Sequence, residues 1–157
     1  MSRLCAIVLT LAMLGLPPAV AWGQGADSFE KSPLAIETAG GRHDFTVELA
    51  TTQAQRQQGL MYRRKMARDA GMLFDYGRTQ PAAMWMKNTF IPLDMLFIDE
   101  DGRIVRVAQR TVPHSLVVVS SGEPVRAVLE LNGGSAARFG IKPGDHVRHA
   151  IFGTAPH

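Results

Sequence analysis

Short apolar segments separated by turn residues follow one another along most of the chain, a pattern that is typical of a β-rich fold. Residues 43–50 alternate apolar and polar side chains, as in a strand with one buried face. A second run, 34–38, precedes them, and Gly40-Gly41 separates the two runs. We expect these residues to form a hairpin with one face in the core.

The later apolar runs predict further strands at 71–76, 84–89, 95–98, 104–107, 127–131 and 146–152. Residues 95–98 are apolar at every position, which indicates a strand that is buried on both faces. Asp101-Gly102 supplies a tight turn into the antiparallel run that follows. Residues 113–124 predict an irregular connection with a little strand.

Two brief helices interrupt the strands. Thr52 and Gln55 have the spacing of a capping box, so a helix is expected to begin there and to end at Gly59. Residues 135–139 predict a second helix, which Gly140 ends. The elements together predict a single compact α+β domain, rich in short and mostly antiparallel strands, built as a partly closed barrel or as packed sheets.

The first 21 residues have the features of a secretory signal peptide. Arg3 makes the start positive, residues 4–16 are apolar, and Ala19-Val20-Ala21 offers the small residues of a cleavage site. The apolar stretch is too short to span a bilayer comfortably. We therefore expect cleavage, with no transmembrane segment afterwards.

Cleavage would leave a flexible leader at residues 22–33 and a domain at residues 34–153. Cys5 is the only cysteine of the chain and lies within the predicted signal peptide. The processed protein then has no thiol, which excludes disulfides, cysteine nucleophiles and thiolate metal sites. We expect a periplasmic or secreted protein that is held together by its core alone.

The charge balance argues against a nucleic-acid partner. The chain holds 17 Lys and Arg and 14 Asp and Glu, a formal net charge of +3. Loss of Arg3 with the signal peptide lowers this charge by one, and the remainder is too small to favour nucleic acid. The basic cluster Arg63, Arg64, Lys65 and Arg68 is expected to be a solvated face rather than a lipid-binding patch.

Six short motifs stand out in the predicted domain. In chain order they are Gln57-Gln58-Gly59-Leu60-Met61, Gly71-Met72-Leu73-Phe74, Trp85-Met86-Lys87-Asn88-Thr89, Ile91-Pro92-Leu93-Asp94, Leu129-Glu130-Leu131 and Gly140-Ile141-Lys142-Pro143-Gly144-Asp145. Together they resemble the DUF192 family, a set of small bacterial and archaeal domains that are often exported, over about residues 34–152. The resemblance implies a compact β-rich domain of unknown function, and it implies no activity, substrate or cofactor.

Residues 84–89 offer the best candidate for a binding surface. In a strand, Trp85, Lys87 and Thr89 would share one side. An indole beside an ammonium and a hydroxyl suits the stacking and orientation of a sugar ring. We therefore predict an exported binding or accessory protein for saccharide or cell-envelope material. The predicted binding residues are Trp85, Lys87, Asn88, Thr89 and Asp94, bordered by Arg56 and Glu130.

A structural explanation of the same polar residues stays open. Asn88 and Asp94 would then clamp the backbone around Pro92, with Trp85 in the core. The two explanations are compatible, because some of the polar groups can hold a bend while others face a ligand.

Two further function classes also stay open. Asp94 and Glu130 lie at the edges of apolar strands and form the best carboxylate pair for acid/base catalysis in a hydrolase. Met84 and Met86 would present two thioethers on one strand face, as a Cu(I)-handling protein requires. The spacing of the histidines favours no metal site, and nothing in the sequence predicts a cofactor.

Overall fold

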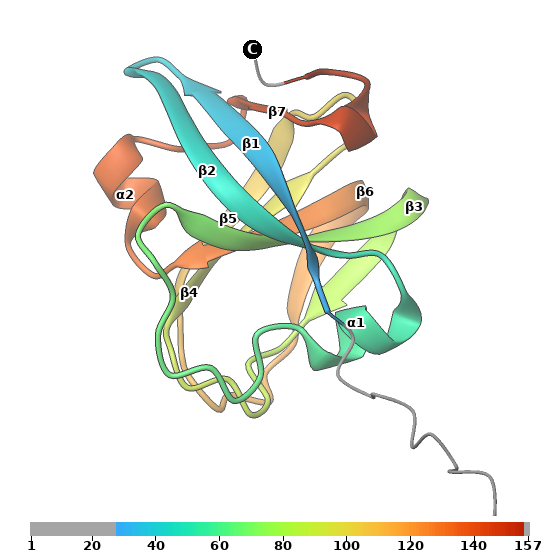
Figure 1. Cartoon of the computed structure of the whole chain (residues 1–157), viewed down its shortest axis with the longest axis vertical. Helices are drawn as coiled ribbons and strands as arrows, with labels where there is room; N and C mark the ends of the chain where they lie inside the picture. Colours follow the sequence, from blue (N-terminus) through green and yellow to red (C-terminus); the bar gives the residue numbers. More distant parts are fainter. Residues whose placement is uncertain (1–27, 156–157) are drawn as a thin grey trace, which may run out of the picture.

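The computed structural model of the protein describes residues 28–155 (Figure 1). The predicted signal peptide, residues 1–21, lies outside the described residues, as do residues 22–27 of the predicted leader. None of the helices within the described part is long and apolar enough to cross a membrane.

The described chain forms one seven-stranded sheet with short helices at its ends. In chain order the elements are β1 (Glu30–Thr38), β2 (Gly41–Ala50), α1 (Gln53–Gln58), β3 (Ala70–Met84), β4 (Leu93–Ile98), β5 (Ile104–Thr111), β6 (Val119–Asn132), α2 (Ser135–Phe139), β7 (His146–Arg148) and the 3-10 helix η1 (Ala150–Phe152). The order across the sheet is β5-β4-β6-β3-β2-β1-β7. Neighbouring strands are antiparallel, except that β2 and β3 are parallel.

The sheet curls until its two edges meet. The N–H of Val147 in β7 donates to the carbonyl of Gly102 at 2.7 Å, and the N–H of Ile104 in β5 donates to the carbonyl of Asp145 at 2.8 Å. These bonds join the edges over a few residues and make the sheet a half-barrel. The predicted β-rich α+β domain is thereby confirmed, in its partly closed barrel form.

β4 and the segments 71–74 of β3 and 127–131 of β6 are buried on both faces, so their alternate side chains enter two different hydrophobic clusters. Leu73 and Leu129 belong to the first cluster, together with residues of β1, β2, α2 and β7. Met72 and Val128 belong to the second, together with residues of the β2–β3 crossover and the far ends of β3 and β6. Every residue of β4 is buried, which confirms the prediction for residues 95–98.

The parallel pairing of β2 with β3 requires a crossover, which residues 51–69 provide. It begins with the predicted capping box: the Gln55 N–H donates to the Thr52 hydroxyl, and the Thr52 N–H donates to the Gln55 side chain. Gly59 ends α1 as predicted. The crossover then continues through Leu60, which anchors it in the second cluster.

The strand predicted at residues 84–89 is not formed. β3 ends at Met84, and the chain turns at Lys87 and Asn88. Asn88 has a φ of 54°, in the left-handed region, which extended strand pairing does not accommodate. The Met86 N–H donates instead to the carbonyl of Ser115 at 3.0 Å, so contacts with a distant loop override the local strand pattern.

Several other boundaries differ from the prediction. β3 runs to Met84 rather than ending at residue 76, because its second half pairs with β6. β4 begins at Leu93 and β5 ends at Thr111, because these two residues pair with each other.

β1 begins at Glu30, within the predicted leader, because its first residues pair with the end of β2. β6 begins at Val119 rather than at residue 127, because it follows the bulged second half of β3. β7 ends at Arg148, because the His149 side chain caps the 3-10 turn that follows.

We expect Gly102→Ala to weaken the contact between β5 and β7 that closes the half-barrel. Gly102 has a φ of +83°, and a Cβ there would lie 2.5 Å from the carbonyl oxygen of Val147. Strain and collision together should lower the free energy of unfolding by about 2 kcal/mol or more, measured by urea denaturation. Gly77→Ala is the control, because Gly77 has a φ of +73° with no atom in reach of a Cβ. Equal losses in the two variants would contradict the steric part of this explanation.

Candidate functional site

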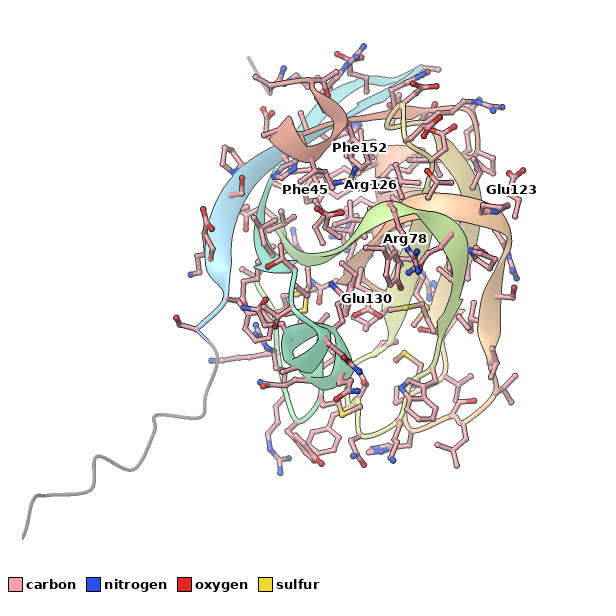
Figure 2. All side chains as sticks on the ribbon, turned by 90° about the vertical axis from the view of Figure 1, so that its right-hand side faces the viewer. Phe45, Arg78, Glu123, Arg126, Glu130 and Phe152 are labelled. Carbon is pink, nitrogen blue, oxygen red and sulfur yellow. The ribbon has the colours of Figure 1, made fainter. Side chains whose placement is uncertain are left out.

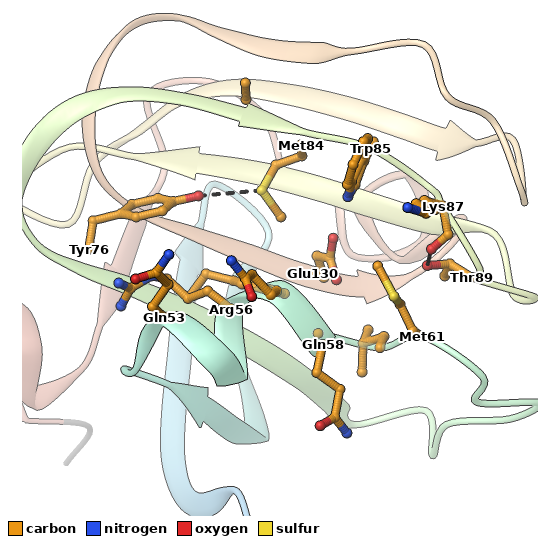
Figure 3. A pocket seen from close by; sticks show the side chains of 15 residues that line it. Gln53, Arg56, Gln58, Met61, Tyr76, Met84, Trp85, Lys87, Thr89 and Glu130 are labelled. Carbon is orange, nitrogen blue, oxygen red and sulfur yellow. Dashed lines mark hydrogen bonds between the residues drawn. The ribbon is translucent and has the colours of Figure 1, made fainter. Parts of the chain in front are cut away.

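A cavity of about 550 Å³ lies over the second hydrophobic cluster (Figure 3). Its walls come from α1, the crossover, β3, residues 84–89 and β6. Apolar side chains such as Phe74 and Leu60 line it together with polar ones.

Glu130 is the buried polar group of the cavity. It pairs in register with Met72 of β3 and Met95 of β4, both in the second cluster, so its side chain points to that face of the sheet. Glu130 is 4% exposed, and burial raises the pKa of its carboxyl to about 8. Among residues 28–155 no hydrogen bond or ion pair serves this carboxyl. At pH 7 it is therefore mostly protonated, and it faces the cavity without a partner.

Tyr76 and Met84 form the wall beside Glu130. The Tyr76 hydroxyl donates to the Met84 sulfur at 3.4 Å (Figure 3). Burial raises the pKa of Tyr76 to about 12, and the negative charge of Glu130 adds to this rise. The phenol therefore stays protonated and offers the cavity a neutral polar group.

Arg56 lines the cavity from α1, and its Nη1 donors are already committed to the backbone. Its guanidinium donates to the carbonyls of Thr51 and, at 3.0 Å, Asp75, and its Cζ lies 5.7 Å from the Tyr76 ring centroid. These contacts hold α1 against β3. The main role of Arg56 in the structure is thus to fix the wall of the cavity.

Trp85, Lys87 and Thr89 line the outer part of the cavity. Trp85 is 48% exposed, and the Lys87 Nζ lies 5.2 Å from the centroid of its ring. Thr89 is buried and its hydroxyl donates to the Lys87 carbonyl at 3.2 Å. The three residues face the cavity as expected, although a turn rather than a strand brings them there.

Asn88 lies beside the cavity and serves the turn. Its side-chain amide donates to the Tyr62 hydroxyl at 2.9 Å, and its backbone carbonyl accepts from the Tyr62 N–H at 2.9 Å. Asn88 therefore ties residues 84–89 to the crossover. Asn88 thus has a structural role, but it bonds to the crossover and not to the backbone around Pro92 as the structural explanation expected. Trp85 is exposed and does not lie in the core as that explanation assumed.

Asp94 does not reach the cavity. It pairs in register with Leu131, a residue of the first cluster, so it points to the opposite face of the sheet from Glu130. Its fully buried carboxylate accepts from the N–H groups of Arg110 (2.7 Å), Gly134 (3.0 Å) and Ala136 (2.8 Å). Asp94 is thus a structural clamp that caps α2, whose N-cap residue, Gly134, has no side chain to do so.

These positions correct two of the open alternatives. Asp94 and Glu130 lie on opposite faces of one sheet, so they do not form a carboxylate pair across a cleft. Met84 lines the cavity, but Met86 does not; its sulfur is buried and accepts from the Thr111 hydroxyl at 3.1 Å. Within the described residues no three His, Cys, Asp or Glu side chains gather in a way that could hold a metal.

The structure therefore brings five of the seven predicted residues to one cavity: Arg56, Trp85, Lys87, Thr89 and Glu130. The sequence analysis missed Gln53, Met61, Phe74 and Tyr76, which also line it. Two of them, Met61 and Phe74, belong to motifs that the sequence did single out. No local pattern marks Gln53 or Tyr76, because the fold alone brings them to Glu130.

The fold and the cavity define a small β-rich half-barrel domain with a partly polar, open pocket at one end. The family model of DUF192, described as "Uncharacterized ACR", matches residues 35–149. The chain belongs to the DUF192 family, which confirms the resemblance seen in its motifs.

Two solved structures are similar over most of the chain. A protein of Sinorhizobium meliloti 1021, described as a "putative transcription regulator", is 54% identical, with a TM-score of 0.78 over 81% of this chain and 99% of that chain. A protein of unknown function from Novosphingobium aromaticivorans DSM 12444 is 40% identical, with a TM-score of 0.77 over 80% of this chain and 89% of that chain. The search of curated proteins finds no match.

Replacing Asp94 by Asn should destabilise the fold. The variant replaces a charged carboxylate, which accepts with both oxygens, by a neutral amide with one accepting oxygen. The free energy of unfolding, measured by urea denaturation, should therefore fall by about 3 kcal/mol. Asp99→Asn is the matched control, since the Asp99 carboxylate also accepts from two backbone N–H groups, in an exposed turn; it should lose about 1 kcal/mol. An Asp94→Asn protein as stable as the wild type would contradict the clamp.

The pKa of Glu130 makes stability depend on pH with a known sign. The carboxyl has a pKa of about 8 in the folded protein, whereas in the unfolded chain it has the ordinary pKa of 4.5. Between these values the folded state binds more protons, so this carboxyl lowers the free energy of unfolding as the pH rises, by up to about 1.4 kcal/mol per pH unit.

Glu130→Gln should remove that dependence. Compared with the wild type, the variant should gain stability steadily between pH 5 and 8, because ionisation of Glu130 in the unfolded chain increasingly favours unfolding of the wild type. Urea denaturation of both proteins across this range measures the difference, in which the contributions of the other titrating groups cancel. A difference that does not change with pH would show that Glu130 is already ionised in the folded protein.

Proposed function

We propose that the protein is an exported single-domain binding protein that takes saccharide or related cell-envelope material into the cavity beside Glu130. The observation that carries this proposal is the Glu130 carboxyl, which lies in the cavity wall without a hydrogen-bond partner among residues 28–155. This carboxyl is therefore available to a molecule that enters the cavity, and a hydrogen bond to it contributes about 0.5–1.5 kcal/mol.

The outer part of the cavity supports a ring as the ligand. The indole of Trp85 is about half exposed and has the Lys87 ammonium beside it. Sugar rings stack on such indole faces while neighbouring polar groups orient their hydroxyls. A protonated Glu130 can both donate to and accept from a hydroxyl, which suits a neutral saccharide better than an anion. The volume of about 550 Å³ lies within the range of small-molecule sites.

Export is part of the proposal and is supported by the first residues of the chain. They combine a positive start, an apolar segment and a small-residue cleavage site. The absence of cysteine after Cys5 is compatible with a protein that leaves the cytoplasm and needs no disulfide.

Binding is favoured over the two other roles that come into question. Hydrolysis by a carboxylate pair is disfavoured because Asp94 lies on the other face of the sheet. The Sinorhizobium relative is named as a transcription regulator, a role that often uses a recognition helix to bind DNA. The helices of this protein do not favour that role, since α1 and α2 have only six and five residues.

The test is a binding titration with defined oligosaccharides, including glycan fragments of peptidoglycan. Trp85→Ala should weaken binding at least tenfold, or about 1.4 kcal/mol, through the loss of stacking, while Trp85→Phe should retain part of the affinity. Val117→Ala is the control, because Val117 is an exposed apolar residue that does not line the cavity. A wild-type protein that binds none of these saccharides, or a Trp85→Ala variant with full affinity, would refute the proposal.

A further inference from the structure

The large apolar side chains that the domain exposes are gathered at one end. Within residues 28–155 six such side chains are exposed, and all six lie on three segments: residues 59–68, 84–92 and 111–119. We call these three segments together the loop tip. The exposed side chains are Tyr62, Trp85, Val112, Leu116, Val117 and Val118.

The three segments form one surface. The Tyr62 N–H donates to the carbonyl of Asn88 at 2.9 Å, and the His114 N–H donates to the carbonyl of Thr89 at 3.1 Å. The Phe90 ring lies between those of Tyr62 and His114, with centroid distances of 6.2 and 5.1 Å. In Figure 1 these connections lie together at the lower end of the molecule, away from β7.

The loop tip is also positively charged. It holds five of the 17 Lys and Arg residues of the chain and none of the 14 Asp and Glu residues. Glu48 of β2 pairs with one of the five, Arg63, at 2.5 Å. Arg64 lies over the Phe90 ring at 5.4 Å, and both Arg64 and Lys65 are exposed. The net charge of +3 is thus concentrated where the apolar side chains are.

We propose that the loop tip docks on an anionic lipid bilayer. Leu116, Val117 and Val118 are 66%, 74% and 60% exposed on consecutive positions of one loop, and they enter the boundary between headgroups and acyl chains. Trp85 and Tyr62 lie at the level of the headgroups, where such residues are enriched. Arg64 and Lys65 contact the lipid phosphates.

A bilayer fits this surface better than a protein partner. The centre of a protein interface is depleted of charged residues, and Lys in particular is rare there. On the loop tip, exposed cations and exposed aliphatic side chains adjoin one another without acidic residues between them. That combination is typical of segments that bind anionic membranes at their surface.

Docking would bring the cavity to the membrane surface, because Trp85 and Lys87 belong both to the loop tip and to the cavity lining. The proposal does not depend on a saccharide as the ligand. Its test can therefore fail or succeed independently of the binding titration.

The test is co-sedimentation with vesicles of phosphatidylcholine, with or without phosphatidylglycerol. It uses residues 22–157, because the whole sheet and both hydrophobic clusters lie within residues 28–155 and the apolar residues 4–16 would bind lipid by themselves. We expect partition into anionic vesicles to be at least about tenfold stronger than into neutral ones, and to weaken with salt.

Two double variants separate the contributions. Leu116→Ser with Val117→Ser should abolish partition without loss of fold, since both side chains are exposed. Arg64→Glu with Lys65→Glu should abolish the preference for anionic vesicles. The matched control is Arg103→Glu with Lys142→Glu, a reversal of two exposed charges near β7, which should bind as the wild type does.

Fluorescence gives a second readout. The chain has two tryptophans, so Trp22→Phe leaves Trp85 as the reporter, and anionic vesicles should shift its emission to shorter wavelength. The Leu116→Ser, Val117→Ser variant should keep the saccharide affinity of the wild type. A wild-type protein that stays in the supernatant with anionic vesicles would overturn the proposal and point to a protein partner. If the Arg103→Glu, Lys142→Glu control lost the preference for anionic vesicles as fully as the Arg64→Glu, Lys65→Glu variant, the assignment to the loop tip would be overturned.

Discussion

The burial on both faces of β4 and of the segments 71–74 of β3 and 127–131 of β6 is the constraint on which the rest of this structure depends. Side chains of these segments enter one of two hydrophobic clusters, and successive residues enter opposite ones. A polar residue there has no solvent face to turn to, in contrast to Glu123 earlier in β6, which is exposed (Figure 2). The position of a buried polar residue in the alternation therefore decides both which cluster it enters and which groups can satisfy it.

Asp94 and Glu130 show the two outcomes of this constraint. Asp94 enters the first cluster and meets three backbone N–H groups, one on β5 and two at the start of α2, so its burial stabilises the fold. Glu130 enters the second cluster, where the described residues offer it no hydrogen bond, and its raised pKa reflects that environment. Two carboxylates on neighbouring strands thus have opposite roles: one is part of the architecture, and the other is available to a ligand.

The parallel pairing of β2 and β3 explains why the cavity lies where it does. The pairing requires a crossover. This crossover carries α1 and residues 59–68 to the same end of the half-barrel as residues 84–92 and 111–119. The proposed ligand site and the proposed membrane surface therefore share residues. A ligand derived from the cell envelope would meet both at once, which gives the two proposals a common physical setting.

The sequence by itself determined the elements whose causes are local: the glycine-linked hairpin, the capping box at Thr52, both short helices and the double burial of β4. It also pointed to five of the fifteen residues that line the cavity: Arg56, Trp85, Lys87, Thr89 and Glu130. Only the tertiary structure decided the turn at Asn88 and the separate roles of Asp94 and Glu130. The reason is physical: the amides that satisfy Asp94 lie 16 to 42 residues away along the chain, and no local pattern records whether a buried carboxyl has such partners.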